Sequence, residues 1–183
     1  GLSWSHSADR STLIRRVHLD LLGLPPELDD LQKWLTSTDR NWYSKMIDHV
    51  LASPRYGERW GRYWLDLAGY ADSEGGTSAD PLRPVAWKYR DYVIRAFNED
   101  KPYDEFLVEQ LAGDELLGLA QNSTASSDTI DKLVATGFLR MGIDETGSRT
   151  MNFVPERLKV VADALSVVSS GLMGLTMECA RCH

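Results

Sequence analysis

Seven residues, MECARCH at 177–183, carry the most specific chemical pattern in the sequence. Both cysteines of the chain lie here, at Cys179 and Cys182, and His183 follows the second one directly. This C-x-x-C-H spacing is the attachment signature of a c-type haem. Two thiols three residues apart reach the two vinyl groups of one porphyrin, and the adjacent histidine becomes an axial iron ligand. The motif therefore predicts covalent haem c on Cys179, Cys182 and His183.

Three other interpretations of the cysteines stay open, although haem is favoured. A redox dithiol usually occurs in a βαβ setting, which this sequence does not suggest. A zinc site needs four ligands, so a further histidine or a second chain would have to complete it. A disulfide between cysteines this close would constrain very little chain and stabilise little.

The motif leaves the second axial ligand of such a haem undecided. Methionine sulfur and histidine nitrogen are the usual donors. The candidates are Met141, Met151, Met173, Met177, His18 and His49. We expect Met173 and Met177 to be packing residues and His18 to be a satisfied histidine on a helix. No candidate is preferred, and a five-coordinate iron is the alternative.

A second group of candidate residues lies in and after the glycine-rich acidic segment DSEGGTSADPLRP, residues 72–84. Asp72 and Glu74 flank Ser73, and Asp91 lies on the next expected helix. Paired carboxylates near tryptophans suit glycoside hydrolysis, and they equally suit calcium. Acidic residues in such loops more often form turns and helix caps. Asp72, Glu74 and Asp91 are therefore weak catalytic candidates.

The hydrophobic pattern has a helical period along most of the chain, and few segments alternate with a period of two. Helices are expected over 10–22, 26–35, 41–52, 54–72, 85–99, 103–118, 129–142 and 155–174. The sequence thus predicts an all-α fold, an irregular multi-helix bundle with long loops and the haem-attachment motif after the last helix. That last helix is apolar around much of its circumference, so we expect it at the centre of the bundle.

The length, charge and hydropathy of the chain limit its domain number and its partners. A chain of 183 residues predicts one domain over 1–183, with a subdivision near 120–128 as the alternative. The net charge of −7 disfavours nucleic acid and anionic membranes as partners. No apolar run approaches the length of a membrane span, and no signal peptide is visible.

Five blocks of sequence together resemble the planctomycete cytochrome-associated PSCyt family. They are ADRSTLIRRVHLDLLGLPP, SPRYGERWGRYWLDLAGYADSEG, AWKYRDYVIRAFNEDKPYDEFLVEQLAGD, ATGFLRMG and GLTMECARCH, in that order. The resemblance implies a domain of unassigned function within a large secreted protein, often with a cytochrome-like domain upstream and another domain downstream. In two places the chain departs from the family: Gly69 replaces an arginine, and an Asp-His-Lys run that usually follows CARCH is absent. In the family, a histidine from that run could serve as the distal ligand.

The expected function is that of an exported c-type cytochrome-like domain, periplasmic or secreted, which transfers electrons or serves a haem-dependent redox step. The expected partners are other domains of the same polypeptide, a redox partner protein and polysaccharide. One alternative is a hydrolase or lyase that acts on extracellular polysaccharide through the carboxylates around Asp72–Asp91. A non-catalytic carbohydrate-binding or scaffolding module is the other.

Overall fold

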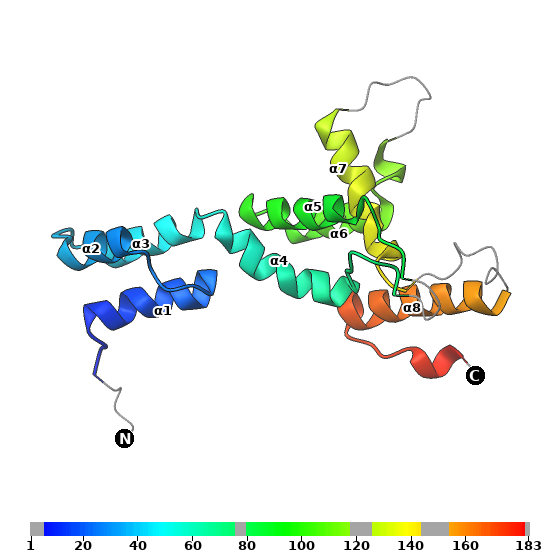
Figure 1. Cartoon of the computed structure of the whole chain (residues 1–183), viewed down its shortest axis with the longest axis horizontal. Helices are drawn as coiled ribbons and strands as arrows, with labels where there is room; N and C mark the ends of the chain where they lie inside the picture. The colour runs from blue at the N-terminus through cyan, green and yellow to red at the C-terminus, as the bar shows by residue number, and fades with distance from the viewer. Residues whose placement is uncertain (1–5, 76–79, 118–125, 144–153, 182–183) are drawn as a thin grey trace. The chain divides into compact units, whose positions relative to one another are not determined.

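The computed structural model describes residues 6–75, 80–117, 126–143 and 154–181 (Figure 1). Over these ranges the chain forms eight α-helices and three short 3₁₀-helices, and its only extended pairing is an isolated bridge between Ser73 and Leu82. This confirms the all-α prediction. Within the same ranges, no helix has the length and apolar character to cross a membrane.

The chain divides into two compact units, residues 1–60 and 61–183. The division falls inside helix α4 (Arg55–Ala68). The polar segment 120–128, predicted as an alternative place for a subdivision, lies inside the second unit, and residues 118–125 are outside the described ranges. That the whole chain is a single domain stays a prediction.

The first unit is built on α1 (Arg10–Leu22), α2 (Leu28–Thr36) and α3 (Trp42–Leu51). Its core consists of Ile14, Val17, Trp34, Met46 and Val50. Both ends of α1 follow local sequence signals. Asp9 caps the start by accepting a hydrogen bond from the Thr12 amide at 2.9 Å, and Gly23 ends the helix with a left-handed φ of 71°.

The second unit contains the end of α4 together with α5 (Ala86–Asn98), α6 (Tyr103–Ala112), α7 (Ser127–Ala135) and α8 (Val154–Met173). The 3₁₀-helices η1 (Glu115–Leu117), η2 (Thr136–Arg140) and η3 (Glu178–Arg181) belong to it as well. Its core consists of Trp64, Ala68, Tyr89, Tyr92, Val93, Ala96, Phe106, Ala135, Phe138 and Met141. Helix α5 supplies the largest share of this core, and α4, α6, α7 and the η2 segment supply the rest.

A buried amide organises the polar groups of this core. The Oε1 atom of Gln110, which is fully buried, accepts hydrogen bonds from the Trp64 indole at 2.8 Å and from the Tyr89 hydroxyl at 2.6 Å. Its Nε2 atom donates to the Phe106 carbonyl at 3.1 Å. Buried donors without an acceptor are costly, so one side chain lets two large aromatic residues sit in the core.

One buried acid is also paired. Glu109 accepts a hydrogen bond from the Tyr92 hydroxyl at 2.7 Å and forms an ion pair with Lys101. Burial, and then the bond to Glu109, raise the pKa of Tyr92 above its usual value. Lys101 compensates the charge of the carboxylate and Tyr92 donates a hydrogen bond to it, and these contacts give Glu109 a structural role.

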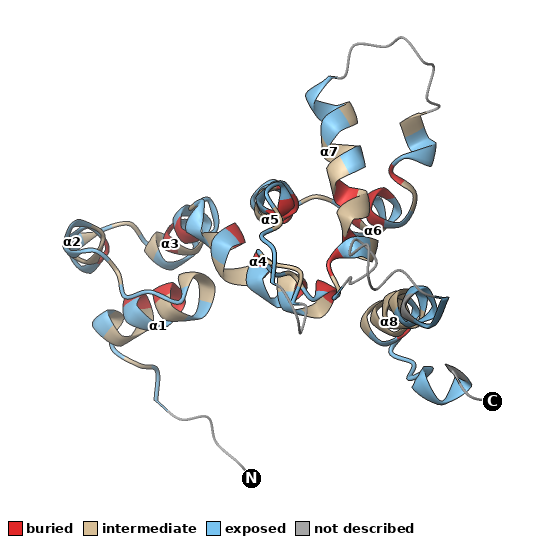
Figure 2. Ribbon diagram, turned by 45° about the vertical axis from the view of Figure 1, so that its right-hand side comes forward, coloured by how far each residue is buried: buried red, intermediate tan, exposed pale blue. Residues whose placement is uncertain are grey.

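Helix α8 does not lie at the centre of a bundle as predicted. Val167, Val168 and Leu172 pack against the core, and Gly171 lies so close to Leu67 that a Cβ there would come within 2.6 Å of its side chain. The described residues leave the opposite side of α8 open, and Figure 2 shows much of the helix as exposed or intermediate. Within that part of the chain, only one face of α8 is therefore used in packing.

We predict that Gln110→Met lowers the free energy of unfolding by about 1 to 3 kcal/mol, because the buried Tyr89 hydroxyl loses its acceptor while the side-chain length is kept. The Trp64 indole loses one of its two acceptors and keeps the Tyr89 oxygen at 3.1 Å. Urea unfolding followed by tryptophan fluorescence measures the loss. Val108→Ala is the matched control, since Val108 lies on the same helix but is exposed, and it should change stability by less than about 0.5 kcal/mol. Equal stability of the two variants would contradict the role given to Gln110.

We also predict an acid-sensitive start to α1. Hydrogen bonds from the Ser11 hydroxyl, and next from the Thr12 amide, lower the pKa of Asp9 from 3.8 to about 2. A lowered pKa stabilises the folded helix above about pH 4, and this contribution is lost as the pH falls through 2. Carboxyl carbon shifts measured by NMR should titrate near pH 2 in the wild type and at a higher pH in Ser11→Ala. An unchanged midpoint in the variant would show that the hydroxyl has no such effect.

Candidate functional site

The segment that carries the cysteines folds back along α8. Gly174, with a left-handed φ of 65°, ends the helix, and the amide of Leu175 donates to the Ser169 carbonyl at 3.0 Å. Figure 1 shows the chain then running beside α8 to η3. Cys179 lies in η3, is exposed and forms no disulfide. Cys182 and His183 are outside the described residues, so the geometry of the full motif is not part of the described structure.

A cavity separates this returning segment from α8. Its volume is about 470 Å³, which is within the usual range of small-molecule sites. Its walls are formed by Ala162, Asp163, Leu165, Ser166, Met177, Glu178 and Ala180. The residues on either side of Cys179 therefore line a ligand-sized space whose other wall is a helix.

A second hollow of about 420 Å³ continues along α8 and is lined by Pro155, Leu158, Val161, Ala162 and Leu165. It shares Ala162 and Leu165 with the first cavity. Every side chain of this second lining is apolar. Together the two hollows offer a broad apolar wall with polar groups, Asp163, Ser166 and Glu178, at one end.

These residues are compatible with a porphyrin in their chemistry. A porphyrin is a flat apolar ring with a polar edge, and it needs an accessible thiol for attachment. Cys179 is exposed, and its neighbours Glu178 and Ala180 line the first cavity. The chemistry of the described residues is therefore consistent with the group that the C-x-x-C-H motif predicts.

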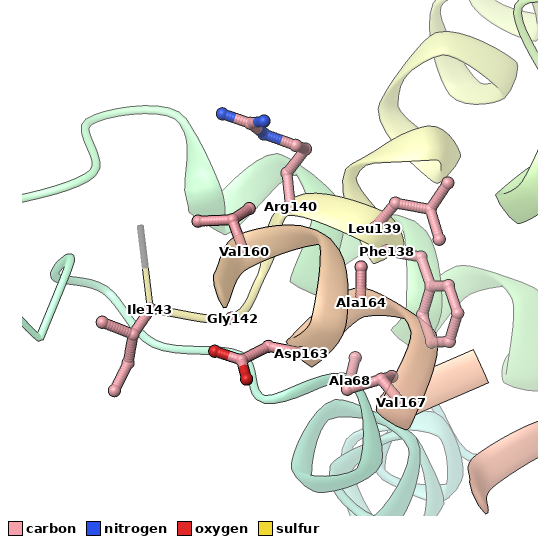
Figure 3. Close-up of a pocket in the computed structure, with 10 residues that line it drawn as sticks. All are labelled: Ala68, Phe138, Leu139, Arg140, Gly142, Ile143, Val160, Asp163, Ala164 and Val167. Atoms are coloured by element: carbon pink, nitrogen blue, oxygen red, sulfur yellow. The ribbon is translucent and has the colours of Figure 1, made fainter. Parts of the chain in front are cut away.

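The pocket on the inner side of α8 is too small for a ligand. It lies where Val160, Ala164 and Val167 approach Phe138 and Ala68, as Figure 3 shows. Its volume of about 20 Å³ holds roughly one water molecule. This pocket is a packing defect between α8 and the rest of the second unit.

Among the candidate axial methionines, Met177 lies at the candidate haem site. It lines the first cavity and is exposed. Met173 is exposed too, so the prediction that these two are packing residues is wrong. Met141 is buried in the core of the second unit, whereas Met151 lies outside the described residues.

The candidate histidines belong to the first unit. His18 is buried and its Nδ1 atom lies 2.9 Å from the Ile14 carbonyl, which confirms the prediction of a satisfied histidine on a helix. The Nε2 atom of His49 lies 3.1 Å from the Asp30 carboxylate. Both rings have structural partners within their own unit, so nothing in their surroundings favours a role in metal binding.

The two ends of the acidic segment are paired with each other. The Ser73–Leu82 bridge closes it, the Glu74 amide donates to the Pro81 carbonyl at 3.0 Å, and the Asp80 carboxylate accepts from the Gly75 amide at 2.7 Å. Asp80 is therefore a turn former. No group of three or more acidic, histidine or cysteine side chains within the described ranges is arranged to bind a metal ion. This part of the structure gives no support to a calcium site.

Two of the three weak catalytic candidates do come together. The Tyr70 hydroxyl donates to Asp72 at 2.6 Å, and the Arg90 guanidinium lies 3.0 Å from the Asp91 carboxylate. Burial, and next the bond to Asp72, raise the pKa of Tyr70 to about 12, and Arg90 and Asp91 act on the same hydroxyl electrostatically. Glu74 makes its contact through the backbone. The three cavities described above include none of these carboxylates.

Sequence reasoning missed two parts of this arrangement. Tyr70 and Arg90 were not recognised as partners of Asp72 and Asp91, although they lie only two positions and one position away from them in the sequence. The apolar wall on α8 was also missed, although the apolar circumference of that helix was a visible signal for it.

Comparison with known proteins gives one result. Neither the curated proteins nor the solved structures contain a match to the chain. A family model does match, and it covers residues 1–183. The five sequence blocks had predicted the same family, and the match extends over the whole length: the chain belongs to the PSCyt2 family, described as a protein of unknown function (DUF1549).

Proposed function

We propose that the second unit binds one haem c covalently and that its function is redox. Cys179 and Cys182 would form the thioether links, and His183 would be the axial ligand on one side of the iron. One observation carries the proposal: the exposed Cys179 belongs to a segment that lines a cavity of about 470 Å³ on α8. A buried or disulfide-bonded cysteine would have argued against it.

The bound haem would supply one-electron transfer between its ferrous and ferric states. The protein residues would fix the ring at Cys179, exclude water through the apolar side chains of α8, and set the local charge. Asp163 and Glu178, both at the cavity, would add negative charge near the ring. Negative charge and solvent exposure favour the ferric state, so these residues bear on the reduction potential.

The same proposal assigns a location and partners. Haem is attached to c-type cytochromes outside the cytoplasm, so the protein would be periplasmic or secreted. Electrons would pass to other domains of the same polypeptide or to a redox partner protein. We propose an extracellular polysaccharide as the substance on which the larger protein acts. This part of the proposal rests on the resemblance to the family alone.

We predict one covalent haem per chain when the protein is exported in cells that contain the c-type maturation machinery. A Soret band that survives denaturation and acid extraction measures attachment, and mass spectrometry locates the haem on the C-terminal peptide. Cys179→Ser and Cys182→Ser should each reduce the covalent haem, and the double variant should lose it.

Glu178→Gln is the matched control for these variants, since it lies next to the motif but supplies no attachment atom. It should keep the wild-type haem content. If the wild-type protein carries no covalent haem while a reference c-type cytochrome from the same cells does, the proposal is overturned.

Two neighbouring pairs, Tyr70 with Asp72 and Arg90 with Asp91, favour a second candidate function, a hydrolase or lyase that acts on polysaccharide. Two carboxyl groups are what acid–base chemistry at a glycosidic bond commonly uses. If this is the function, Asp72→Asn should lower polysaccharide turnover by about 100-fold or more, with the haem spectrum unchanged.

Asp80→Asn is the control for that experiment, because Asp80 lies in the same acidic turn and only holds its backbone. Release of reducing sugar measures turnover. Equal rates for the two variants would exclude a catalytic role for Asp72. A carbohydrate-binding or scaffolding role stays a prediction, and binding of polymer without turnover would support it.

A further inference from the structure

Helix α8 has a row of large apolar side chains that the protein leaves open to solvent. Leu158, Val161 and Leu165 are 62%, 56% and 57% exposed. Their spacing of three and four residues places them on one side of the helix. Isolated exposed leucines are ordinary, but a contiguous apolar row beside a cavity usually marks a binding surface.

This row is continuous with the surroundings of Cys179. Leu158, Val161 and Leu165 line the hollow along α8, and Leu165 also lines the cavity formed with the returning segment. Glu178 and Ala180, on either side of Cys179, form the facing wall of that cavity. A ring attached to the Cys179 sulfur is held at this position, so its effective local concentration at the row is high without any further contact.

We infer that the row Leu158–Val161–Leu165 is the wall on which the porphyrin attached at Cys179 rests. This inference depends on the proposed function, and it adds the residues that cover one face of the ring. Burying a flat apolar ring against these side chains would remove apolar surface from water on both partners, which is a favourable term. The row would therefore limit the solvent exposure of the haem, and through it influence the reduction potential.

The test compares two leucines of similar exposure in the haem-loaded protein. Leu165→Glu changes the wall, whereas Leu116→Glu changes a leucine in η1 that is 53% exposed and lines neither hollow. Haem content from mass spectrometry, circular dichroism in the Soret region and the reduction potential are measured for both. Far-ultraviolet circular dichroism checks that each variant is folded.

We predict that Leu165→Glu keeps covalent haem but loses most of the Soret dichroism and has a lower reduction potential. A carboxylate in the wall admits water and stabilises the ferric state, which gives the sign of the shift. Leu116→Glu should match the wild type in all three measurements. Leu165→Met, which keeps the wall apolar, should also match it.

The outcomes separate the inference from the proposed function. Absence of covalent haem from the wild-type protein overturns both. Covalent haem with identical spectra and potentials in Leu165→Glu and Leu116→Glu overturns the inference alone. A change from dimer to monomer in Leu165→Glu by light scattering, with an unchanged haem spectrum, would assign the row to a second copy of the chain and overturn the inference as well.

Discussion

The left-handed turn at Gly174 is the constraint on which the candidate haem site depends. Its φ of 65° ends α8 and directs the following residues back along that helix. A Cβ at this position would meet no atom within 4 Å, so the requirement for glycine comes from the backbone conformation and not from crowding. This reversal brings Glu178 and Ala180, the two neighbours of Cys179, to the cavity that they line together with α8.

The second physical feature is the division of α8 into two faces with different surroundings. On the inner face, close approach at Gly171 brings the helix against Leu67, and Val167 packs on the core. The small pocket left on this side shows that the space there is nearly filled. The apolar side chains of the outer face have no such cover from the described residues, and this makes α8 at once a structural element and a candidate binding surface.

The two candidate sites differ in the structural contacts that their reactive groups make. The Asp72 carboxylate accepts a hydrogen bond from the Tyr70 hydroxyl, and backbone hydrogen bonds hold the turn around it. Those contacts are sufficient to explain why the acidic residues are there. Cys179, in contrast, is exposed, forms no disulfide and lies between two residues that line a cavity of ligand size. Its position has no structural explanation of this kind, so the haem proposal is the stronger of the two.

Local features of the sequence determined most of the helices and their ends. The periodic apolar residues predicted the helices, Asp9 and Gly23 mark the ends of α1, and the bond of His18 to its own helix follows from a spacing of four. The C-x-x-C-H pattern was also readable directly, because its chemistry depends only on residue types a few positions apart. The family assignment came from ordered blocks of the same kind of local information.

Other features were decided by tertiary structure. A helix that is apolar around its circumference can be buried on all sides or can keep one face open, and only the packing of α8 on Leu67 and the core distinguishes the two cases. Likewise, Gln110 became a central residue because Trp64 and Tyr89, far from it in sequence, direct their donors to it. Sequence periodicity records which residues share a helix face, but it carries no information on which partner covers that face.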